Sequence, residues 1–390
     1  MSALMNTYNR VDLTIERGEG ATLVTADGRR FLDFTSGIAV TALGHCHPHL
    51  VKALQAQAEK VWHCSNLFRI PGQEKLAQRL ADASFADAVF FGNSGAEAIE
   101  CGLKLIRKYQ DDFGDPKRYR VIAFEGAFHG RTLATLAAAG NEKYLKGYAP
   151  NVDGFDQVPF GNLNEVRARI TPETAAILIE PVQGEGGMRA ANAQFLKDLR
   201  TVCDEFGLLL MFDEVQCGMG RTGKLFAHEW AGVTPDILST AKALGGGFPL
   251  GACLATEKVA KAFGHGSHGS TFGGNPLGMA IGNAVLDVML APGFLDNVSK
   301  LGRHLDKRLG DLSKRFPKVF TEVRGIGLIR GLKCAGSNAE VVDQARAKGL
   351  LLVSAADNVV RLLPPLIVTE AELDQGIDLL AEIAAQAKAA

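Results

Sequence analysis

The sequence predicts an α/β fold, in which a large domain holds a mostly parallel sheet and a smaller α/β domain is formed by both ends of the chain. Short runs of consecutive apolar residues recur between residues 88 and 255, with helical patterns between several of them. Apolar strands joined by helical crossovers indicate a sheet covered on both faces. After about residue 280 the pattern changes to a long helix, short strands and a terminal helix. We therefore predict a small domain from residues 1–50 and 281–390 and a large domain from residues 51–280.

The first elements are predicted by turn and helix-start signals. Residues 22–34, TLVTADGRRFLDF, alternate around Asp27-Gly28, which is typical of a hairpin. Pro48 is a good first residue for a helix. The apolar face of that helix is expected to hold Leu50, Leu54, Ala58 and Val61.

The later elements are predicted by apolar runs and by one capping motif. The runs expected to form the large sheet are AVFF (88–91), VIAF (121–124), AILI (176–179), LLLMF (208–212), DIL (236–238) and ACLA (252–255). Beyond them we expect a helix near 294–316, strands around 319–332 and 359–363, and a helix over 370–388. The last helix is opened by a capping box, Thr369 with Glu372.

Composition and charge narrow the classes of protein. Of the 390 residues 47% are hydrophobic and 22% charged, which is typical of a globular chain and not of a disordered one. A net charge of −1 gives no basic field for nucleic acid or anionic lipid. No run of 18 apolar residues and no signal-peptide pattern is found, and the seven cysteines are scattered without a CxxC pair. We expect a cytoplasmic protein with small-molecule partners and with neither nucleic acid nor membrane as a partner.

Candidate functional residues follow the predicted strands, because ligands of open α/β sheets bind beyond the carboxyl ends of strands. After the first run come Ser94, Gly95, Ala96 and Glu97 at the start of a helix. Ser94 and Glu97 fit a capping box, and the free N–H groups of the same helix start fit a phosphate. The two interpretations are compatible, and the junction alone does not choose between them.

Lys242 lies between an apolar strand and the triple glycine 245–247. A lysine on a loop is most often solvated. Among small and apolar neighbours, however, desolvation lowers the pKa of its ammonium group from ~10.4 and makes it a nucleophile that can form a Schiff base. Asp213 follows the LLLMF run, where a carboxylate can bind Mg²⁺ or a ligand.

Two other segments are weaker candidates for a functional site, one for binding a nucleotide and one for binding a metal ion. Residues 218–224 match the nucleotide-binding motifs GxxxxGK and GxGxxG, but Leu225 stands where a P-loop needs Ser or Thr, and the motif does not follow its strand directly. His45, His47 and His49 surround Cys46 like metal ligands, but no second cluster is evident, and a polar loop is the better interpretation. We therefore predict no metal site.

Three further loops complete the candidate site. Residues 127–131 place Phe128 beside Arg131, residues 180–187 bring carboxylates on a flexible loop, and residues 270–276 offer hydroxyl groups. A nucleophilic lysine, an acid at a strand end, a phosphate-binding helix start and an aromatic ring are together the groups that pyridoxal phosphate requires.

The ordered motifs of the chain resemble those of the class III, or ornithine-type, aminotransferases, and among them most closely the acetylornithine branch. The motifs are SGIAVTALGHCHP, FFGNSGAEAIE, FEGAFHGRT, IEPVQGEGG, FDEVQCGMGRTG, STAKALGGGFPLGA, STFGGNPL and RLLPPL. They cover nearly the whole chain, and the set is far more specific than any one motif. The resemblance implies a fold type I transferase dependent on pyridoxal 5'-phosphate, and a homodimer with shared active sites.

The resemblance also implies a role for each matching residue. Lys242 is the catalytic residue, which binds the cofactor aldehyde and moves a proton. The residues implied to bind the cofactor, besides Lys242, are Ser94, Gly95 and Ala96 (phosphate), Phe128 (ring face), Asp213 (ring nitrogen), Gln216 (ring hydroxyl), the adjoining Glu214 and Val215, and Thr271 (the neighbouring subunit's phosphate). Ala96 stands where many relatives carry Thr, so a hydroxyl is missing from the implied phosphate site.

Four residues are implied to bind the substrates. Arg131 holds the carboxylate of acetylornithine, with Ser270 near the same substrate. Arg361 binds the α-carboxylate of 2-oxoglutarate, and Glu185 pairs with Arg361 when the amino donor is bound. The expected reaction moves the terminal amino group of N2-acetyl-L-ornithine to 2-oxoglutarate, giving N-acetylglutamate semialdehyde and glutamate for arginine biosynthesis. Succinylornithine, N-succinyl-diaminopimelate, ornithine and 4-aminobutyrate remain alternative donors.

Overall fold

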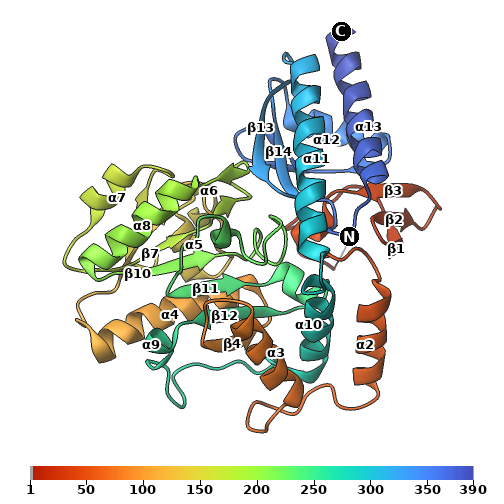
Figure 1. Ribbon diagram of the computed structural model, residues 1–390. Coiled ribbons are helices and arrows are strands. Elements are labelled where there is room, and N and C mark those ends of the chain that lie inside the picture. Colours follow the sequence, from red (N-terminus) through yellow and green to blue (C-terminus); the bar gives the residue numbers. More distant parts are fainter. Residues whose placement is uncertain (1–2, 390) are drawn as a thin grey trace.

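The computed structural model describes residues 3–389, and its largest element is a seven-stranded sheet in the order β4-β12-β11-β10-β7-β5-β6 (Figure 1). The strands are β4 (Ala88–Gly92), β5 (Arg120–Phe124), β6 (Phe155–Val158), β7 (Thr174–Ile179), β10 (Leu209–Asp213), β11 (Ile237–Thr240) and β12 (Gly251–Ala255). β12 runs antiparallel to both neighbours, and all other neighbours are parallel. The mostly parallel sheet is thus confirmed. β6 was not predicted, because FDQV has only two apolar residues.

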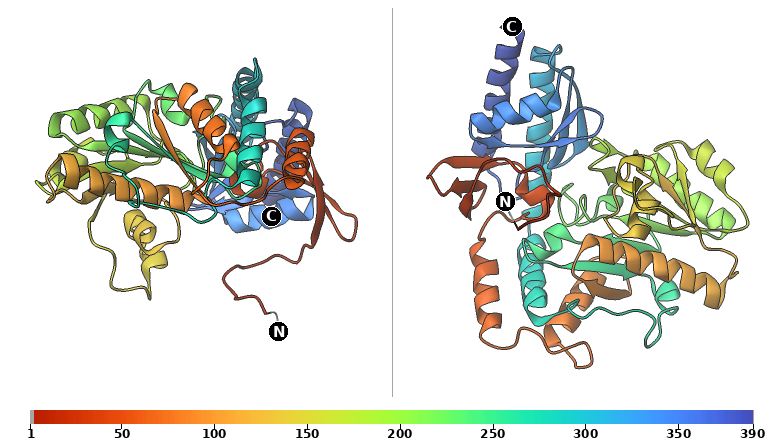
Figure 2. Two further views of the ribbon diagram at one scale, coloured as in Figure 1. Left: turned by 90° about the horizontal axis from the view of Figure 1, so that it is seen from below. Right: turned by 180° about the vertical axis from the view of Figure 1, so that it is seen from behind.

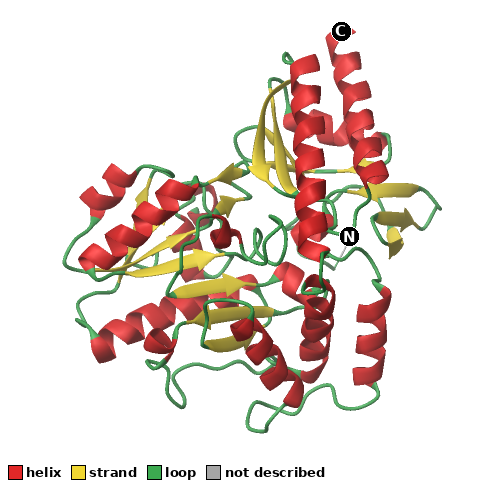
Figure 3. Cartoon of the chain, in the orientation of Figure 1, coloured by secondary structure: helices red, strands yellow, loops and turns green. Residues whose placement is uncertain are grey.

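Helices cover both faces of this sheet, as the alternation of side chains along β7 shows. Ala176 and Leu178 pack in a core with Ile99 and Ile106 of α4 (Gly95–Phe113). Ile177 and Ile179 belong to another core that includes Leu199 of α8 (Ala193–Phe206). Successive side chains of a strand point to opposite faces, so a strand buried on both sides is apolar throughout. Figure 3 shows the strands lying between the two layers of helices.

The remaining helices of this part lie around the sheet and along its edge. They are α3 (Pro71–Asp82), α5 (Leu133–Ala139), α6 (Glu142–Leu145), α7 (Leu163–Arg169), α9 (Glu257–Ala260) and the 3-10 turns η1 (Ala227–Trp230) and η2 (Lys242–Gly245). A short hairpin joins β8 (Val182–Gln183) to β9 (Arg189–Ala190). Helices α2 (Pro48–Ala58) and α10 (Pro276–Met289) pack against each other at the lower right of Figure 1.

Both ends of the chain form the second part of the molecule, as predicted. Its strands are β1 (Ile15–Glu19), β2 (Thr22–Thr25), β3 (Arg30–Asp33), β13 (Phe320–Ile326), β14 (Ile329–Cys334), β15 (Leu350–Leu351), β16 (Val353–Ala355) and β17 (Val359–Leu362). Its helices are α1 (Ser36–Ala39), α11 (Phe294–Arg315), α12 (Asn338–Ala347) and α13 (Glu370–Ala389). The strands of this part form two sheets, in the orders β1-β2-β3-β15 and β13-β14-β17-β16.

Local signals explain several of these elements. The predicted hairpin is formed by β2 and β3, and Thr369 and Glu372 make the predicted capping box at the start of α13. In α11 the buried Leu301, Leu305 and Leu309 recur every four residues on one face. The borders at residues 50 and 280 stay a prediction, since α10 runs through residue 280, and residues 1, 2 and 390 of the predicted small domain lie outside the described residues.

Two features concern the outside of the molecule. Residues 3–14 contain no helix or strand, and Figure 2 shows this segment as an extended arm that leaves the body. Within residues 3–389 no single helix has both the length and the hydropathy of a membrane span. The pair α10 and α11 meets both criteria only together, and it bends by 70°.

Candidate active site

A cavity of 430 Å³ lies where the carboxyl ends of β10 and β11 meet the start of α4. The sheet brings these ends together, because Asp213 of β10 is paired with Ser239 of β11. The predicted residues that line the cavity are Ser94, Gly95, Ala96, Phe128, Arg131, Asp213, Val215, Gln216 and Lys242. Residues from four separate loops of the sequence therefore converge on one site.

Lys242 follows β11 and begins η2 with a backbone φ of +43°, in the region that non-glycine residues seldom adopt. Burial lowers the pKa of its ammonium group, while the nearby Asp213 and Glu185 carboxylates oppose this shift and Arg361 adds to it. The direction of this shift is the one expected from the sequence. A lysine with a lowered pKa has more of the neutral amine that attacks carbonyl groups.

Asp213 is held from two sides at the end of β10. Its Oδ1 accepts a hydrogen bond from the N–H of Val215 at 3.0 Å, and its Oδ2 lies 2.7 Å from Nδ1 of His129. Asp213 and His129 are only 3% and 2% exposed, so the pair is sheltered from water. These contacts fix the carboxylate in one orientation at the cavity wall.

A second carboxyl group, that of Glu180, lies beside Asp213. Glu180 follows β7, whose Ile179 is paired with Phe212, so the two acids occupy neighbouring strand ends. Its Oε2 accepts a hydrogen bond from the N–H of Phe128 at 3.1 Å. Burial, and then the Asp213 charge, raise the pKa of Glu180 well above its usual value. Glu180 therefore fixes the backbone of Phe128 and favours the protonated form.

The start of α4 forms another wall. Ser94 caps the helix by accepting from the N–H of Glu97 at 3.2 Å, as predicted. The Glu97 carboxylate accepts from the N–H of Asn93 at 2.8 Å, one residue before the position in a standard capping box. The first N–H groups of a helix have no partner within the helix, so those of Gly95 and Ala96 can bind an anion in the cavity.

Arg131 is stacked on an aromatic ring. Its guanidinium carbon lies 3.9 Å from the centroid of Tyr144 and 5.4 Å from that of Phe128. The two rings are perpendicular to each other, 6.4 Å apart. Tyr144 lies in α6, outside every motif considered in the sequence. The Arg131 cation is thereby held at the cavity by ring contacts, which leave its N–H groups available to bind a carboxylate.

Two buried polar atoms of cavity residues have no hydrogen-bond partner in the described part of the chain, Oε1 of Gln216 and Nε2 of His129. Buried polar atoms are almost always paired in proteins. A Cβ at Gly184 would lie 1.7 Å from the same Oε1, so a larger residue at position 184 would displace the Gln216 side chain. The cavity is therefore shaped for a polar ligand.

Arg361 and Glu185 form an ion pair near the cavity. Nη1 of Arg361 donates to Oε1 of Glu185 at 2.5 Å, and Nη2 donates to the carbonyl of Ser354 at 3.2 Å. The side chain of Arg361 is 2% exposed and that of Glu185 is 30% exposed. The structure thus pairs Glu185 with Arg361, and the dependence of this pair on the bound substrate stays a prediction.

Segment 36–39 leads into the cavity residue Val40 through a left-handed turn. The φ angles of Ser36, Ile38 and Ala39 are +45°, +63° and +64°. Asp33 holds the turn by accepting from the N–H of Ser36 at 3.2 Å, and the Ser36 hydroxyl donates to the carbonyl of Leu363 at 2.6 Å. Such strain is most often found beside functional sites.

Three predicted site residues lie elsewhere. The Glu214 carboxylate accepts from the N–H groups of Ala227 and His228, at 2.5 and 2.9 Å, so its side chain holds η1 and does not line the cavity. Ser270 uses its hydroxyl to accept from the N–H of Gly273 at 2.9 Å and does not line the Lys242 cavity of its own chain. Thr271 is exposed next to it.

The two weaker alternatives find no support. Residues 218–224 form turns and open no α-helix, and Arg221 within them is buried and donates to the carbonyls of Leu328 and Pro364. Lys224 lies over the ring of Trp230, at 5.4 Å from its centroid. His45 and His49 contact different carboxylates, those of Asp33 and Asp287. Within residues 3–389 no three His, Cys, Asp or Glu side chains are grouped to hold a metal ion.

Sequence reasoning assigned no role to three residues of this site. Glu180 could have been chosen by the rule that selected Asp213, since each stands at the carboxyl end of a buried strand. His129 stands between two residues that were chosen, Phe128 and Arg131. Tyr144 carries no such signal, because its contact with Arg131 arises only from the fold.

The comparisons with known proteins agree with this geometry. A family model described as aminotransferase class-III matches residues 4–384. Acetylornithine aminotransferase of Brucella melitensis biotype 1 is 59% identical over 374 residues, which are 96% of this chain and 93% of that protein. N-acetylornithine aminotransferase from Stenotrophomonas maltophilia K279a has 39% identity and a TM-score of 0.85, over 98% of each chain. Ornithine aminotransferase from Toxoplasma gondii, described with partial occupancy of PLP at its active site, has 30% identity and a TM-score of 0.92, over 96% of this chain and 91% of that chain. The chain belongs to the class III aminotransferase family.

Proposed function

We propose that the protein is a pyridoxal-phosphate-dependent aminotransferase that moves the terminal amino group of N2-acetyl-L-ornithine to 2-oxoglutarate, giving N-acetylglutamate semialdehyde and glutamate in arginine biosynthesis. The observation that carries the proposal is the cavity shared by Lys242, Asp213 and the start of α4. Support for the acylated donor comes from relatives named acetylornithine aminotransferase, such as that of Brucella melitensis at 59% identity.

The residues of the cavity fit pyridoxal phosphate. An aldehyde needs an amine, which Lys242 offers, and a phosphate needs the N–H groups at the start of α4. A flat ring needs an aromatic neighbour and polar partners. Phe128 supplies the first, and the unpartnered Oε1 of Gln216 suits a ring hydroxyl. The Asp213 carboxylate, fixed by Val215 and His129, suits the protonated ring nitrogen.

The chemistry is divided between the cofactor and the chain. When bound, pyridoxal phosphate supplies an electron sink for the charge that develops at the carbon bearing the amine. Nζ of Lys242, whose pKa burial lowers, moves the proton from that carbon. Asp213 keeps its orientation through His129, and Glu180 holds the loop of Phe128.

Two arginines allow one pocket to accept two substrates in turn. Arg131, exposed and stacked on Tyr144, binds the carboxylate of the acylated donor. Arg361, paired with Glu185 while that donor is bound, binds the α-carboxylate of glutamate or 2-oxoglutarate once Glu185 moves away. The α-amine of the donor is acylated and carries no positive charge, so the pocket needs no acidic side chain to bind it.

A panel of amino donors tests the substrate. The purified enzyme is mixed with acetylornithine, succinylornithine, ornithine or 4-aminobutyrate, and the change in the visible absorbance of the cofactor gives each rate. We expect acetylornithine to react fastest, and a faster reaction with 4-aminobutyrate would refute the choice of donor. Borohydride reduction followed by peptide mapping should find the cofactor on Lys242, and a cofactor fixed to any other residue would refute the site.

We also propose a homodimer with shared active sites. Apolar side chains with high exposure gather on residues 61–68 and at Phe272, among them Trp62 at 64% and Leu67 at 89%. The two segments are in contact, because Asn66 donates to the carbonyl of Ser270 at 3.1 Å. A large exposed apolar patch is typical of an interface.

Pairing through this patch accounts for the exposed position of Thr271, which we expect to reach the partner's phosphate site, with Ser270 near the substrate. Analytical ultracentrifugation should show a dimer that Leu67→Asp with Trp62→Ser dissociates. A monomeric native protein would refute the dimer. We propose a cytoplasmic location, which agrees with the seven free cysteines of the chain.

A further inference from the structure

The loop that carries Glu185 is docked on a turn of the other part of the molecule. We call residues 184–189 the switch loop and residues 356–358, between β16 and β17, the anchor turn. The N–H of Ala356 donates to the carbonyl of Glu185 at 3.0 Å. Nη1 of Arg324 donates to the carbonyl of Gly187 at 3.3 Å and to the Asp357 carboxylate at 2.7 Å. Arg324 thus links the two segments.

Gly187 shows how closely the two segments approach. Its φ is +102°, and a Cβ on it would lie 2.9 Å from the carbonyl oxygen of Ala356 and 3.3 Å from Cβ of Asp357. Any side chain at this position would push the switch loop away from the anchor turn. The contact between backbones therefore depends on glycine.

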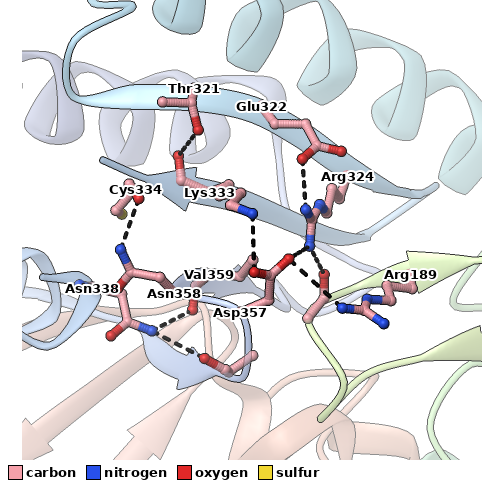
Figure 4. A network of polar contacts seen from close by, with 12 residues as sticks. Arg189, Thr321, Glu322, Arg324, Lys333, Cys334, Asn338, Asp357, Asn358 and Val359 are labelled. Atoms are coloured by element: carbon pink, nitrogen blue, oxygen red, sulfur yellow. Dashed lines mark hydrogen bonds and ion pairs between the residues drawn. The ribbon is translucent and has the colours of Figure 1, made fainter. Parts of the chain in front are cut away.

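The anchor turn is itself rigid. Asp357 and Asn358 both have positive φ, +53° and +56°. The Asn358 amide donates to the carbonyl of Cys334 at 2.7 Å, and the Asn338 amide donates to the carbonyl of Val359 at 2.9 Å (Figure 4). The turn is thereby fixed to the sheet whose strand β17 carries Arg361.

Asp357 is the centre of the charged contacts in Figure 4. Besides Arg324, it accepts from Nζ of Lys333 at 2.9 Å and lies 3.8 Å from Nη2 of Arg189. The Arg324 side chain is 14% exposed, whereas that of Lys333 is 33% exposed. Of the two, Arg324 also donates to the backbone of the switch loop, at Gly187, and to the Glu322 carboxylate at 2.6 Å, whereas the hydrogen bond of Lys333 goes to Asp357.

We propose that Arg324 and Asp357 are positioning residues that fix the switch loop on the anchor turn and so keep Glu185 in place to compete for Arg361. With the backbone fixed, only the side chain of Glu185 has to move when a dicarboxylate substrate binds. The inference rests on the proposed function, in which Glu185 and the substrate carboxylate exchange at Arg361. Arg324 acts through Glu185 and touches no substrate.

The inference predicts a gain in binding, which damage to the fold would not give. Arg324→Met frees the switch loop, weakens Glu185 as a competitor, and should lower the Kd of glutarate, an unreactive dicarboxylate, by about 3- to 10-fold in calorimetry. The KM for glutamate should fall by the same factor, and that for acetylornithine should stay unchanged. Hydrogen exchange of the switch-loop amides should become faster.

The controls use the matched lysine and the competitor itself. Lys333→Met removes the same charge from Asp357 without touching the switch loop and should leave the glutarate Kd unchanged. In a Glu185→Gln background, Arg324→Met should have no further effect on it. Gly187→Ala places a Cβ 2.9 Å from the carbonyl oxygen of Ala356 and so separates the switch loop from the anchor turn. This variant should therefore have the same effect on the glutarate Kd as Arg324→Met. Thermal unfolding checks that each variant is folded.

The outcomes separate the inference from the proposed function. If Glu185→Gln tightens glutarate but Arg324→Met behaves like Lys333→Met or weakens glutarate, the inference is wrong and the proposed switch stands. If Glu185→Gln leaves glutarate binding unchanged, the exchange at Arg361 is wrong and the inference falls with it.

Discussion

The ion pair between Glu185 and Arg361 gives the sharpest test of how one pocket serves two substrates. In the native chain Nη1 of Arg361 lies 2.5 Å from the Glu185 carboxylate. Glu185→Gln removes the negative charge but keeps a side-chain oxygen that can accept from the same N–H group. A substrate carboxylate then displaces a neutral group instead of a charged one. We expect glutamate and 2-oxoglutarate to bind more tightly, because their competitor is weaker.

The magnitude follows from the burial of the pair. A hydrogen bond to a charged group contributes about 1.5 to 3 kcal/mol. Arg361 is 2% exposed but Glu185 is 30% exposed, so water screens the pair on one side and the lower end, about 1.5 to 2 kcal/mol, applies. This corresponds to a fall of roughly 10- to 30-fold in the KM for glutamate.

The assay compares two half-reactions of the same enzyme. The visible absorbance of the cofactor follows the reaction with glutamate and, separately, with acetylornithine, whose carboxylate we assign to Arg131. The acetylornithine reaction is the internal control, since the neighbours of Arg361 do not change when that donor binds. Equal changes in both half-reactions, or weaker binding of glutamate, would refute the competition.

Three further predictions follow from other contacts. Tyr144→Leu removes the ring whose centroid lies 3.9 Å from the exposed Arg131. The KM for acetylornithine should rise about 2- to 5-fold while the KM for 2-oxoglutarate stays unchanged, and Tyr144→Phe, which keeps a ring, should leave the native KM for acetylornithine. An effect on both substrates would contradict a role through Arg131. Asp213→Asn should lower kcat for both half-reactions by at least about 100-fold, and an unaffected rate would remove Asp213 from the chemistry. Burial lowers the pKa of His228 to about 4 from 6.5, so its contribution to stability is complete above pH 6.5 and is lost as the pH falls towards 4. His228→Phe should therefore reduce the acid-induced loss of unfolding free energy by up to about 3 kcal/mol between pH 7 and 4, measured by urea unfolding; equal losses in both proteins would contradict the shift.

Much of this site could be predicted, because it is built from residues at the ends of strands or just beyond them. Lys242, Asp213 and Ser94 were found in this way, and parallel strands place such residues at one edge of the sheet. Glu214 shows the limit of the rule. Successive residues at a strand end point in opposite directions, so Asp213 faces the cavity while Glu214 turns to the backbone of η1.

Contacts between distant segments could not be predicted from local patterns. Tyr144 meets Arg131 across a loop, and the Ser270 hydroxyl accepts from the N–H of Gly273 in its own turn and from the amide of Asn93, which lines the cavity. The strand β6 was missed because burial by tertiary packing, and not its own composition, makes it part of the sheet. The anchor turn likewise has no sequence signal that connects it to Glu185.

The pairing of β3 with β15 has a consequence for the biosynthesis of the chain. Leu32 is paired with Leu350, so one edge of β3 has no neighbour until more than 300 further residues have been translated. At 5 to 20 residues per second this takes roughly 15 to 60 s. During that time the nascent chain presents an unpaired strand edge, which is the kind of surface that chaperones bind and that aggregates form on. The two sheet segments can therefore pair only after every strand of the central sheet has been translated.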